Sequence, residues 1–306
     1  MEYNLIVILG PTASGKTKLA VRLAFDTGAE IISADSRQVY RGMDIGTGKD
    51  LNEYFIDGAL IPCHLINILE PDDEFSVFEY QRRFFKCFME ISSKGMIPIM
   101  VGGTGLYVES VLKGYKMPIV PENPQLKKEL DRYEMKTLVD RFLNLNSAAH
   151  NTTDLKDRAR LIRAIEIAEH IHAHGPEGAA GSPHIIPMVI GTRWERPVLR
   201  RRITERLRER LANGMIEEAK RLHDSGISWE RLEYFGLEYR YLGLYLQGII
   251  NYNDMFQKLN TQIHQFAKRQ ETWFRRMERN GINIHWLKNA DYEEALALIK
   301  GLSGDH

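Results

Sequence analysis

A short segment near the start of the chain restricts the possible folds strongly. The pattern GxxxxGK[ST] is matched by Gly10-Pro11-Thr12-Ala13-Ser14-Gly15-Lys16-Thr17, which directly follows the apolar run Leu5–Leu9. Such a run is typical of a strand that is buried on both faces of a parallel sheet. In this motif the glycines let backbone N–H groups surround a phosphate, Lys16 neutralises its oxygens and Thr17 offers a hydroxyl to Mg²⁺. We therefore predict a phosphate-binding loop at 10–17, with Thr17 as a metal ligand.

The rest of the chain predicts an alternation of strands and helices. Apolar runs and helical periodicity indicate strands over 30–34, 97–101, 185–190 and 282–287, and helices over 16–27, 76–94, 125–145, 154–172 and 197–279. The order strand, helix, strand is typical of parallel βαβ units. We predict an α/β fold in which a parallel sheet like that of P-loop NTPases is flanked by helices.

The predicted organisation divides the chain into five segments. These are an α/β core over 1–117, a small helical insertion over 118–154, a continuation of the core over 155–230 with its strand near 185–190, a helical part over 231–280, and a closing strand and helix of the core over 281–306.

The distribution of charge indicates an RNA partner. Lys and Arg number 41, as do Asp and Glu, so a uniformly basic surface is excluded. Residues 191–288, however, contain 19 Lys and Arg but only 12 Asp and Glu, and Arg193–Arg210 contains eight arginines. Arginine suits bidentate contacts with phosphate. We expect any polyanion to bind this half of the chain.

Membrane and disulfide classes are not indicated. No stretch approaches the roughly 20 apolar residues that a membrane span needs, and 5–9 is too short for the apolar part of a signal peptide. Cys63 and Cys87 lie 24 residues apart and are interpreted as reduced thiols. We expect a soluble, cytoplasmic protein with no membrane partner.

The phosphate loop alone leaves the reaction open. No NKxD segment for reading guanine is present. A small-molecule kinase is possible, because Asp35 at the end of the second predicted strand could accept a proton from a substrate hydroxyl. The same residue could instead only be the N-cap of a following helix.

Further segments carry a resemblance to a known family. They are Asp35-Ser36-Arg37-Gln38-Val39-Tyr40-Arg41-Gly42-Met43-Asp44-Ile45-Gly46-Thr47, Val101-Gly102-Gly103-Thr104-Gly105-Leu106-Tyr107, Arg160-Leu161-Ile162-Arg163-Ala164-Ile165-Glu166, Arg202-Ile203 with Gly214-Met215-Ile216-Glu217-Glu218, and Ala267-Lys268-Arg269-Gln270-Glu271-Thr272-Trp273-Phe274-Arg275. With the phosphate loop, they resemble the tRNA dimethylallyltransferases over roughly residues 5 to 276.

The resemblance implies a prenyl transfer to tRNA. A dimethylallyl group would pass from its diphosphate to N6 of the adenosine 3′ to the anticodon, with Mg²⁺ as cofactor and the phosphate loop holding the leaving diphosphate. It implies three catalytic residues: Asp35 as acceptor of the amine proton, Thr104 between diphosphate and adenosine, and Arg202 near the diphosphate. Arg206, one turn further on, is a second candidate for that contact, but we interpret it as part of a solvated face.

The resemblance also implies which residues contact the anticodon loop. They are Asp35, Ser36, Arg37, Gln38, Thr104, Arg160, Arg163, Lys268, Arg269 and Gln270. The helical part over 231–280 would be the tRNA-binding part, and we expect a monomer. A prenyltransferase that acts on free adenylate is the remaining alternative, although it would not need the basic helical half.

The chain departs from the family in places. The family usually has Gly-Tyr, a basic residue and Glu where Gly236-Leu237-Glu238-Tyr239-Arg240 stands here. The insertion is short. His170, His172 and His174 suggest a metal site, but they sit near the end of a predicted helix, where a cation is favoured in any case.

Overall fold

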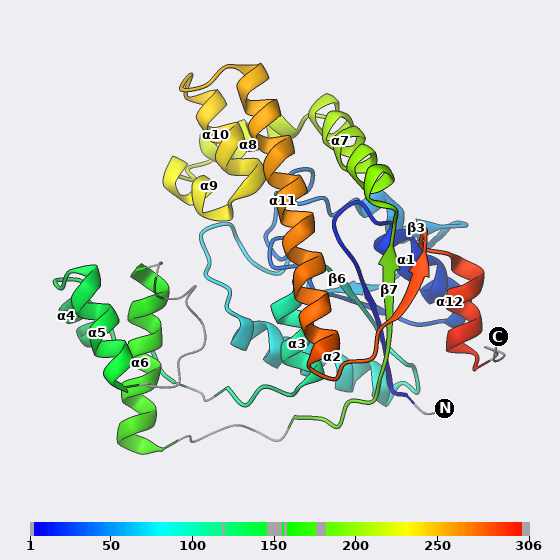
Figure 1. The fold of residues 1–306 in the computed structure, drawn as a ribbon, viewed down its shortest axis with the longest axis horizontal. Helices are drawn as coiled ribbons and strands as arrows, with labels where there is room; N and C mark the ends of the chain where they lie inside the picture. The colour runs from blue at the N-terminus through cyan, green and yellow to red at the C-terminus, as the bar shows by residue number, and fades with distance from the viewer. Residues whose placement is uncertain (1–2, 118–119, 146–154, 156–157, 176–181, 302–306) are drawn as a thin grey trace. The chain divides into compact units, whose positions relative to one another are not determined.

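The computed structural model describes residues 3–117, 120–145, 155, 158–175 and 182–301. The chain forms two compact units, one made of Met1–Lys113 with Pro183–His306 and the other of Gly114–Ser182 (Figure 1).

A six-stranded sheet forms the centre of the larger unit. Its strand order is β5-β2-β6-β1-β7-β8, and all of its pairings are parallel. The strands are β1 (Leu5–Leu9), β2 (Ile31–Ser33), β5 (Cys63–His64), β6 (Ile99–Gly102), β7 (Pro187–Arg193) and β8 (His285–Lys288). The predicted parallel sheet flanked by helices is confirmed.

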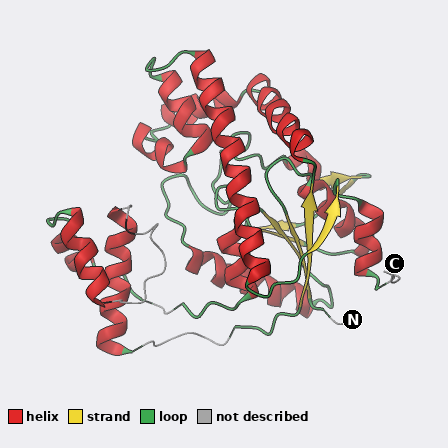
Figure 2. Cartoon of the chain, viewed as in Figure 1, coloured by secondary structure: helices red, strands yellow, loops and turns green. Residues whose placement is uncertain are grey.

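Helices cover both faces of this sheet (Figures 1 and 2). The helices are α1 (Lys16–Thr27) and α12 (Tyr292–Ile299) on one face, and α2 (Val77–Ser93) with α3 (Gly105–Leu112) on the other. Successive residues of β1 alternate between the two cores: Ile6 packs with α1, whereas Val7 packs with α2 and α3. Burial of β1 on both faces explains why its sequence is apolar throughout.

A helical part adjoins the sheet within the same unit. It consists of α7 (Arg196–Ala212), α8 (Met215–Asp224), α9 (Trp229–Phe235), α10 (Leu237–Leu246) and α11 (Tyr252–Arg279). It begins well before the predicted boundary at 231, which falls inside α9. The reason is shared burial, since Leu207 of α7 and Leu259 of α11 belong to one core. Farther along α11, Phe274 belongs to the core of the sheet instead, so this helix spans both.

The smaller unit is a helical cluster. It contains α4 (Pro124–Leu130), α5 (Met135–Leu145) and α6 (Arg158–His174), whose core includes Leu130, Phe142 and Ile165. The prediction ended the insertion at 154 and assigned the following helix to the core, whereas the structure groups α6 with α4 and α5. The single helix predicted over 125–145 is also two helices. Arg158 donates to the carbonyls of Leu130, Asp131 and Tyr133 at the break between them.

Four small elements after β2 were not predicted. They are the 3₁₀ helix η1 (Leu51–Tyr54), the antiparallel pair β3 (Phe55–Ile56) and β4 (Ala59–Leu60), and the edge strand β5. Two-residue strands have too few positions to show alternation. Within the part of the chain that the structure describes, no helix is both long and apolar enough to cross a membrane.

Candidate active site

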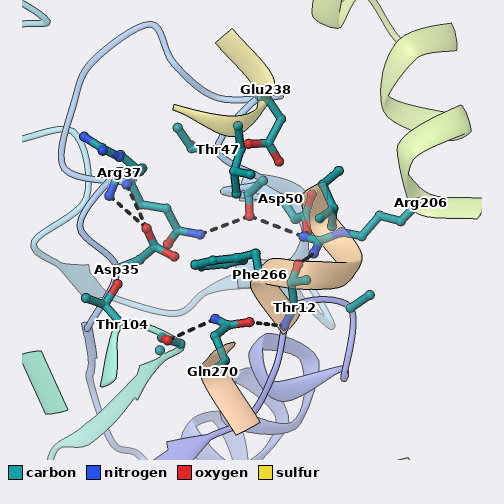
Figure 3. Close-up of a pocket in the computed structure, with 18 of the residues that line it drawn as sticks. Thr12, Asp35, Arg37, Thr47, Asp50, Thr104, Arg206, Glu238, Phe266 and Gln270 are labelled. Atoms are coloured by element: carbon teal, nitrogen blue, oxygen red, sulfur yellow. Dashed lines mark hydrogen bonds and ion pairs between the residues drawn. The ribbon is translucent and has the colours of Figure 1, made fainter. Parts of the chain in front are cut away.

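A cavity of about 910 Å³ opens at the carboxyl edge of the sheet. It is lined by the phosphate loop, the turns that follow β2 and β6, and side chains of α7, α10 and α11, all within the larger unit (Figure 3). Parallel strands bring their carboxyl ends to one edge, where ligands of such sheets bind. The register places Leu9 of β1 beside Gly102 of β6, so the turns that follow these strands lie side by side.

The phosphate loop has a tightly fixed backbone. Ala13 and Gly15 both adopt the left-handed conformation, with φ of 61° and 86°. A side chain at Gly10 would overlap with Thr192 of β7. The Thr192 hydroxyl donates to Ser14 Oγ at 2.6 Å, and Ser14 is fully buried. This geometry leads directly into the start of α1, where free N–H groups favour an anion.

Lys16 is the cation of this loop. Its Nζ lies 3.4 Å from the Pro11 carbonyl oxygen, and the side chain lines the cavity. Burial, together with the nearby charge of Arg206, lowers the pKa of Lys16 to about 8, although the charges of Asp35 and Asp50 partly oppose this shift. A bound anion would favour the protonated ammonium. Thr17, the predicted metal ligand, lines the same cavity.

Arg202 secures the phosphate loop from α7. Its Nε donates to the Ala13 carbonyl oxygen at 2.9 Å, and its guanidinium lies 4.2 Å from the centre of the Trp194 ring. Trp194 Nε1 in turn donates to the Ser14 carbonyl oxygen at 2.8 Å. Arg202 also lines the cavity, so the structure brings it to the loop as the resemblance implied.

Arg206 does not lie on a solvated face, and that interpretation was wrong. It lines the cavity, forms an ion pair with Asp50 and donates to Thr12 Oγ1 at 3.4 Å. Asp50 precedes it by 156 residues, so nothing in the local sequence indicates this partner. The guanidinium therefore joins the phosphate loop to the loop that follows β2.

Asp35 and Thr104 lie together at another side of the cavity (Figure 3). Asp35 Oδ1 accepts hydrogen bonds from the backbone N–H groups of Arg37 at 2.8 Å and Gln38 at 3.4 Å. The Ser36 N–H donates to Thr104 Oγ1 at 3.1 Å. Asp35 thus caps a turn with one oxygen, while Oδ2 forms no hydrogen bond within the described ranges. One carboxylate oxygen remains for a substrate.

Gln270 of α11 joins two of these turns. Its Oε1 accepts from the Thr12 N–H at 2.8 Å, and its Nε2 donates to the Gly103 carbonyl oxygen at 2.9 Å. Gly103 has no room for a side chain, because a Cβ there would overlap with Gln270 Nε2. The structure therefore gives this amide a positioning contact inside the protein. The sequence had suggested only an RNA contact.

The other residues implied to contact RNA are placed in different surroundings. Arg37 Nη2 donates to the Tyr234 carbonyl oxygen at 3.1 Å, and Gln38 Nε2 donates to that of Gly48 at 3.0 Å. Arg269 is exposed and lines the cavity, whereas Lys268 lies in a separate groove between α7 and α11.

Two of the implied RNA contacts belong to the smaller unit. Arg160 and Arg163 are both on α6. Arg163 forms an ion pair with Glu166 at 3.0 Å and donates to the Val120 carbonyl oxygen at 2.6 Å. On the same helix, the rings of His170 and His174 stack at 4.5 Å. Among the residues whose positions are described, no group of three or more His, Cys, Asp or Glu side chains could hold a metal ion.

Glu218 has a role that the sequence did not indicate. Its carboxylate accepts from the N–H groups of Asp44, Ile45 and Gly46, each at 2.8 Å, and from the Tyr239 hydroxyl at 2.7 Å. The loop after β2 is thereby fixed to α8 and α10. The glycine-rich stretch 46–48 was the only local sign of this close packing.

The departure at 236–240 brings a second carboxylate to the cavity. Glu238 lines it, 3.7 Å from the guanidinium of Arg210. Burial raises the pKa of Glu238, while the charge of Arg210 opposes the shift. Arg210 lies one turn beyond Arg206 on α7, so both face the cavity.

Comparison with known proteins identifies clear relatives. The family described as IPP transferase matches residues 38–277, and that described as isopentenyl transferase matches residues 3–59. The tRNA dimethylallyltransferase 1 of Syntrophus aciditrophicus (strain SB) is 60% identical over 301 residues, which are 98% of this chain and 99% of that protein.

Solved structures agree with this result. The full-length tRNA isopentenylpyrophosphate transferase from Bacillus halodurans is 33% identical, with a TM-score of 0.68 over 99% of this chain and 95% of that one. A eukaryotic dimethylallyltransferase acting on tRNA shares the fold, with a TM-score of 0.72 at 21% identity over 97% of this chain and 77% of that one.

Proposed function

The chain belongs to the IPP transferase family, and on that premise we infer that it is a tRNA dimethylallyltransferase, which transfers a dimethylallyl group from dimethylallyl diphosphate to tRNA. The acceptor that we propose is N6 of the adenosine 3′ to the anticodon. One observation supports this most: the phosphate loop with Lys16 and the pair Asp35–Thr104 open into the same cavity.

The proposed reaction forms a bond between N6 and C1 of the dimethylallyl group and breaks the bond between C1 and the diphosphate oxygen. Negative charge then develops on the leaving diphosphate. Lys16, Arg202 and the N–H groups at the start of α1 are placed to stabilise it.

Asp35 is the proposed acceptor of the N6 proton. Its Oδ1 is held by the turn at Arg37 and Gln38, so the carboxylate has a fixed orientation. The neighbouring hydroxyl of Thr104 accepts from the Ser36 N–H and keeps its own proton available for a substrate oxygen or nitrogen. Both groups are therefore positioned before the substrate binds.

Mg²⁺ is the proposed cofactor. Its usual protein sites use one or two oxygen ligands together with phosphate oxygens and water. The Thr17 hydroxyl beside Lys16 fits that pattern, and Thr17 would hold the ion next to the diphosphate. When bound, the ion would supply further positive charge to the leaving group.

The proposed RNA partner must present one base to this cavity. Turning an adenosine out of a stacked loop costs a few kcal/mol. Arg269 and Arg37 at the cavity, with the basic face of α7, would offset that cost through phosphate contacts.

The deciding experiment offers labelled dimethylallyl diphosphate with bulk tRNA and, separately, with AMP. In parallel, ATP is offered with bulk tRNA and with small alcohols. Labelled RNA, with modified adenosine after digestion, is the expected product. ATP turnover with an alcohol would instead support a small-molecule kinase. Labelled AMP without labelled RNA would support the prenyltransferase that acts on free adenylate.

A further inference from the structure

The guanidinium of Arg210 is the least satisfied charged group of the cavity. The side chain is only 13% exposed, and its ion pair with Glu238 at 3.7 Å is too long for a hydrogen bond. It donates no hydrogen bond to any residue that the structure describes, and its Nε is buried without a partner among them. A buried N–H that has lost water without gaining a partner is costly, and the remaining donors of this guanidinium are available to a ligand.

The backbone beside Arg210 is shaped to admit it. Gly48 has a left-handed φ of 61°, and a Cβ at this position would overlap with Nη2 of Arg210 and come within 2.8 Å of Nη2 of Arg206. Both guanidiniums thus lie against one bare stretch of main chain. Arg206 uses that proximity to reach the Gly48 carbonyl oxygen at 3.4 Å, whereas Arg210 does not.

Cations converge on one region of the cavity. The charges of Arg206 and Arg210 both lower the pKa of Lys16. Burial lowers the pKa of Arg210 itself to about 10, so the group stays charged at neutral pH. Such a cluster is unfavourable unless anions offset it. Arg206 has Asp50 in hydrogen-bonding contact, but Arg210 has only the distant Glu238.

We propose that Arg210 binds the diphosphate of the prenyl donor, and that Glu238 competes with the diphosphate for this guanidinium. The inference rests on the proposed function for the identity of the donor. The shared chemistry is a phosphoryl oxygen, which an RNA phosphate also offers. The diphosphate is favoured as its source, because Arg210 lines the same cavity as the phosphate loop. Arg206, which lies against Gly48 with it, contacts Thr12 of that loop.

Substitutions of Arg210 and of Glu238 are expected to change diphosphate affinity in opposite directions. Arg210→Met removes the cation and should weaken the binding of inorganic diphosphate by about 10- to 100-fold, as for a lost charged hydrogen bond. Glu238→Gln removes the competitor and should tighten binding by about three- to fivefold, as for a weak ion pair. Arg208→Met, on the same helix but facing the other groove, is the matched control and should leave affinity unchanged.

Calorimetry with inorganic diphosphate on the full chain measures these affinities. Thermal unfolding of each variant is followed in parallel, because Arg210→Met leaves Glu238 without its cation. The double variant Arg210→Met with Glu238→Gln restores the charge balance, and it should still bind diphosphate as weakly as Arg210→Met alone. If the ion pair is purely structural, each single variant should lower the unfolding temperature, and the two variants should not change diphosphate affinity in opposite directions.

Affinity changes of the same sign in both single variants, or no change in either, would overturn the proposal. A loss of affinity for an anticodon stem-loop RNA, with diphosphate binding intact, would also overturn it and assign Arg210 to an RNA phosphate. The proposed function has its own readout, since prenyl transfer by the wild type is assayed separately. If the two variants change diphosphate affinity in these opposite directions while the wild type prenylates no RNA, the proposed function is contradicted. The proposed diphosphate site would then still stand.

Discussion

Gln270 Oε1 accepts a hydrogen bond at 2.8 Å from the backbone N–H of Thr12 in the phosphate loop, 258 residues earlier in the chain. The other end of the same amide holds the Gly103 carbonyl oxygen. A helix of the proposed RNA-binding part thus fixes the relative position of the two turns between which donor and acceptor would meet.

Gln270→Ala should therefore loosen the site. The Thr12 N–H and the Gly103 carbonyl would lose their partner, and we expect a loss of about 1–3 kcal/mol in the free energy of unfolding. Diphosphate affinity should fall as well, because the loop backbone is less fixed. Urea unfolding and calorimetry measure the two effects. Gln257→Ala, exposed on the same helix, should change stability by less than about 0.5 kcal/mol. Equal effects of both variants would contradict the bridging role.

Asp35→Asn separates the charge of this residue from its capping role. An asparagine oxygen can still accept from the Arg37 and Gln38 N–H groups, so the turn should persist. Turnover should fall by roughly 10²–10⁴, the range for removal of a general base, with donor affinity nearly unchanged. Single-turnover prenylation of tRNA measures this. Asp73→Asn, at an exposed cap that accepts from the Glu70 N–H, is the control. Near-normal turnover of Asp35→Asn would show that Asp35 acts only as a cap.

Diphosphate affinity should depend on pH through Lys16. With its pKa lowered to about 8, Lys16 is protonated at pH 7 and loses its charge as the pH rises above 8. The affinity of the wild type should then weaken between pH 7.5 and 9.5, by up to about tenfold per pH unit above the pKa. Lys16→Arg keeps its charge over that range. Ionisation of diphosphate itself affects the wild type and Lys16→Arg equally, so it cancels in the ratio of their affinities. A ratio that stays constant over this pH range would exclude Lys16 as the titrating group.

Binding of tRNA should weaken steeply with salt, and the slope should report which arginines and lysines contact phosphate. Arg269 lines the cavity and Lys268 does not. Arg269→Glu should lower the slope of log affinity against log salt by about 1 to 2, as for one reversed contact, without affecting binding of dimethylallyl diphosphate. Lys86→Glu on α2 is the exposed control. An unchanged slope in Arg269→Glu and in Lys268→Glu would move the RNA site away from α11.

Local patterns in the sequence were sufficient for the central fold. β1 and the helix after the phosphate loop begin and end at the predicted residues, because burial on two faces and the glycine motif each leave a signature within a few positions. Ser76 likewise caps α2, as its spacing to Glu79 indicates.

The features that the sequence did not predict depend on contacts between residues far apart in the chain. Arg206 resembles any arginine of a solvated helix until Asp50 is placed beside it, and the burial of Ile165 depends on α4 and α5. The bridge that Gln270 forms between two turns was likewise not predicted, because both turns are more than 150 residues away. Such contacts are made by tertiary packing, which no periodicity encodes.

The carboxylate of Glu218 accepts hydrogen bonds from three successive backbone N–H groups of the loop after β2. Gly48 and Asp50 follow directly in the same loop. Hydrogen exchange at Asp44, Ile45 and Gly46 should therefore follow the opening of α8 and not that of β2. The loop after β2 and the helices α8 and α10 are then expected to open as one cooperative unit. A fragment cut down to the sheet would lose the contacts of Arg202 and Gln270 with the phosphate loop and, with them, the shape of the pocket. The helices therefore contribute to donor binding as well as to the proposed recognition of RNA.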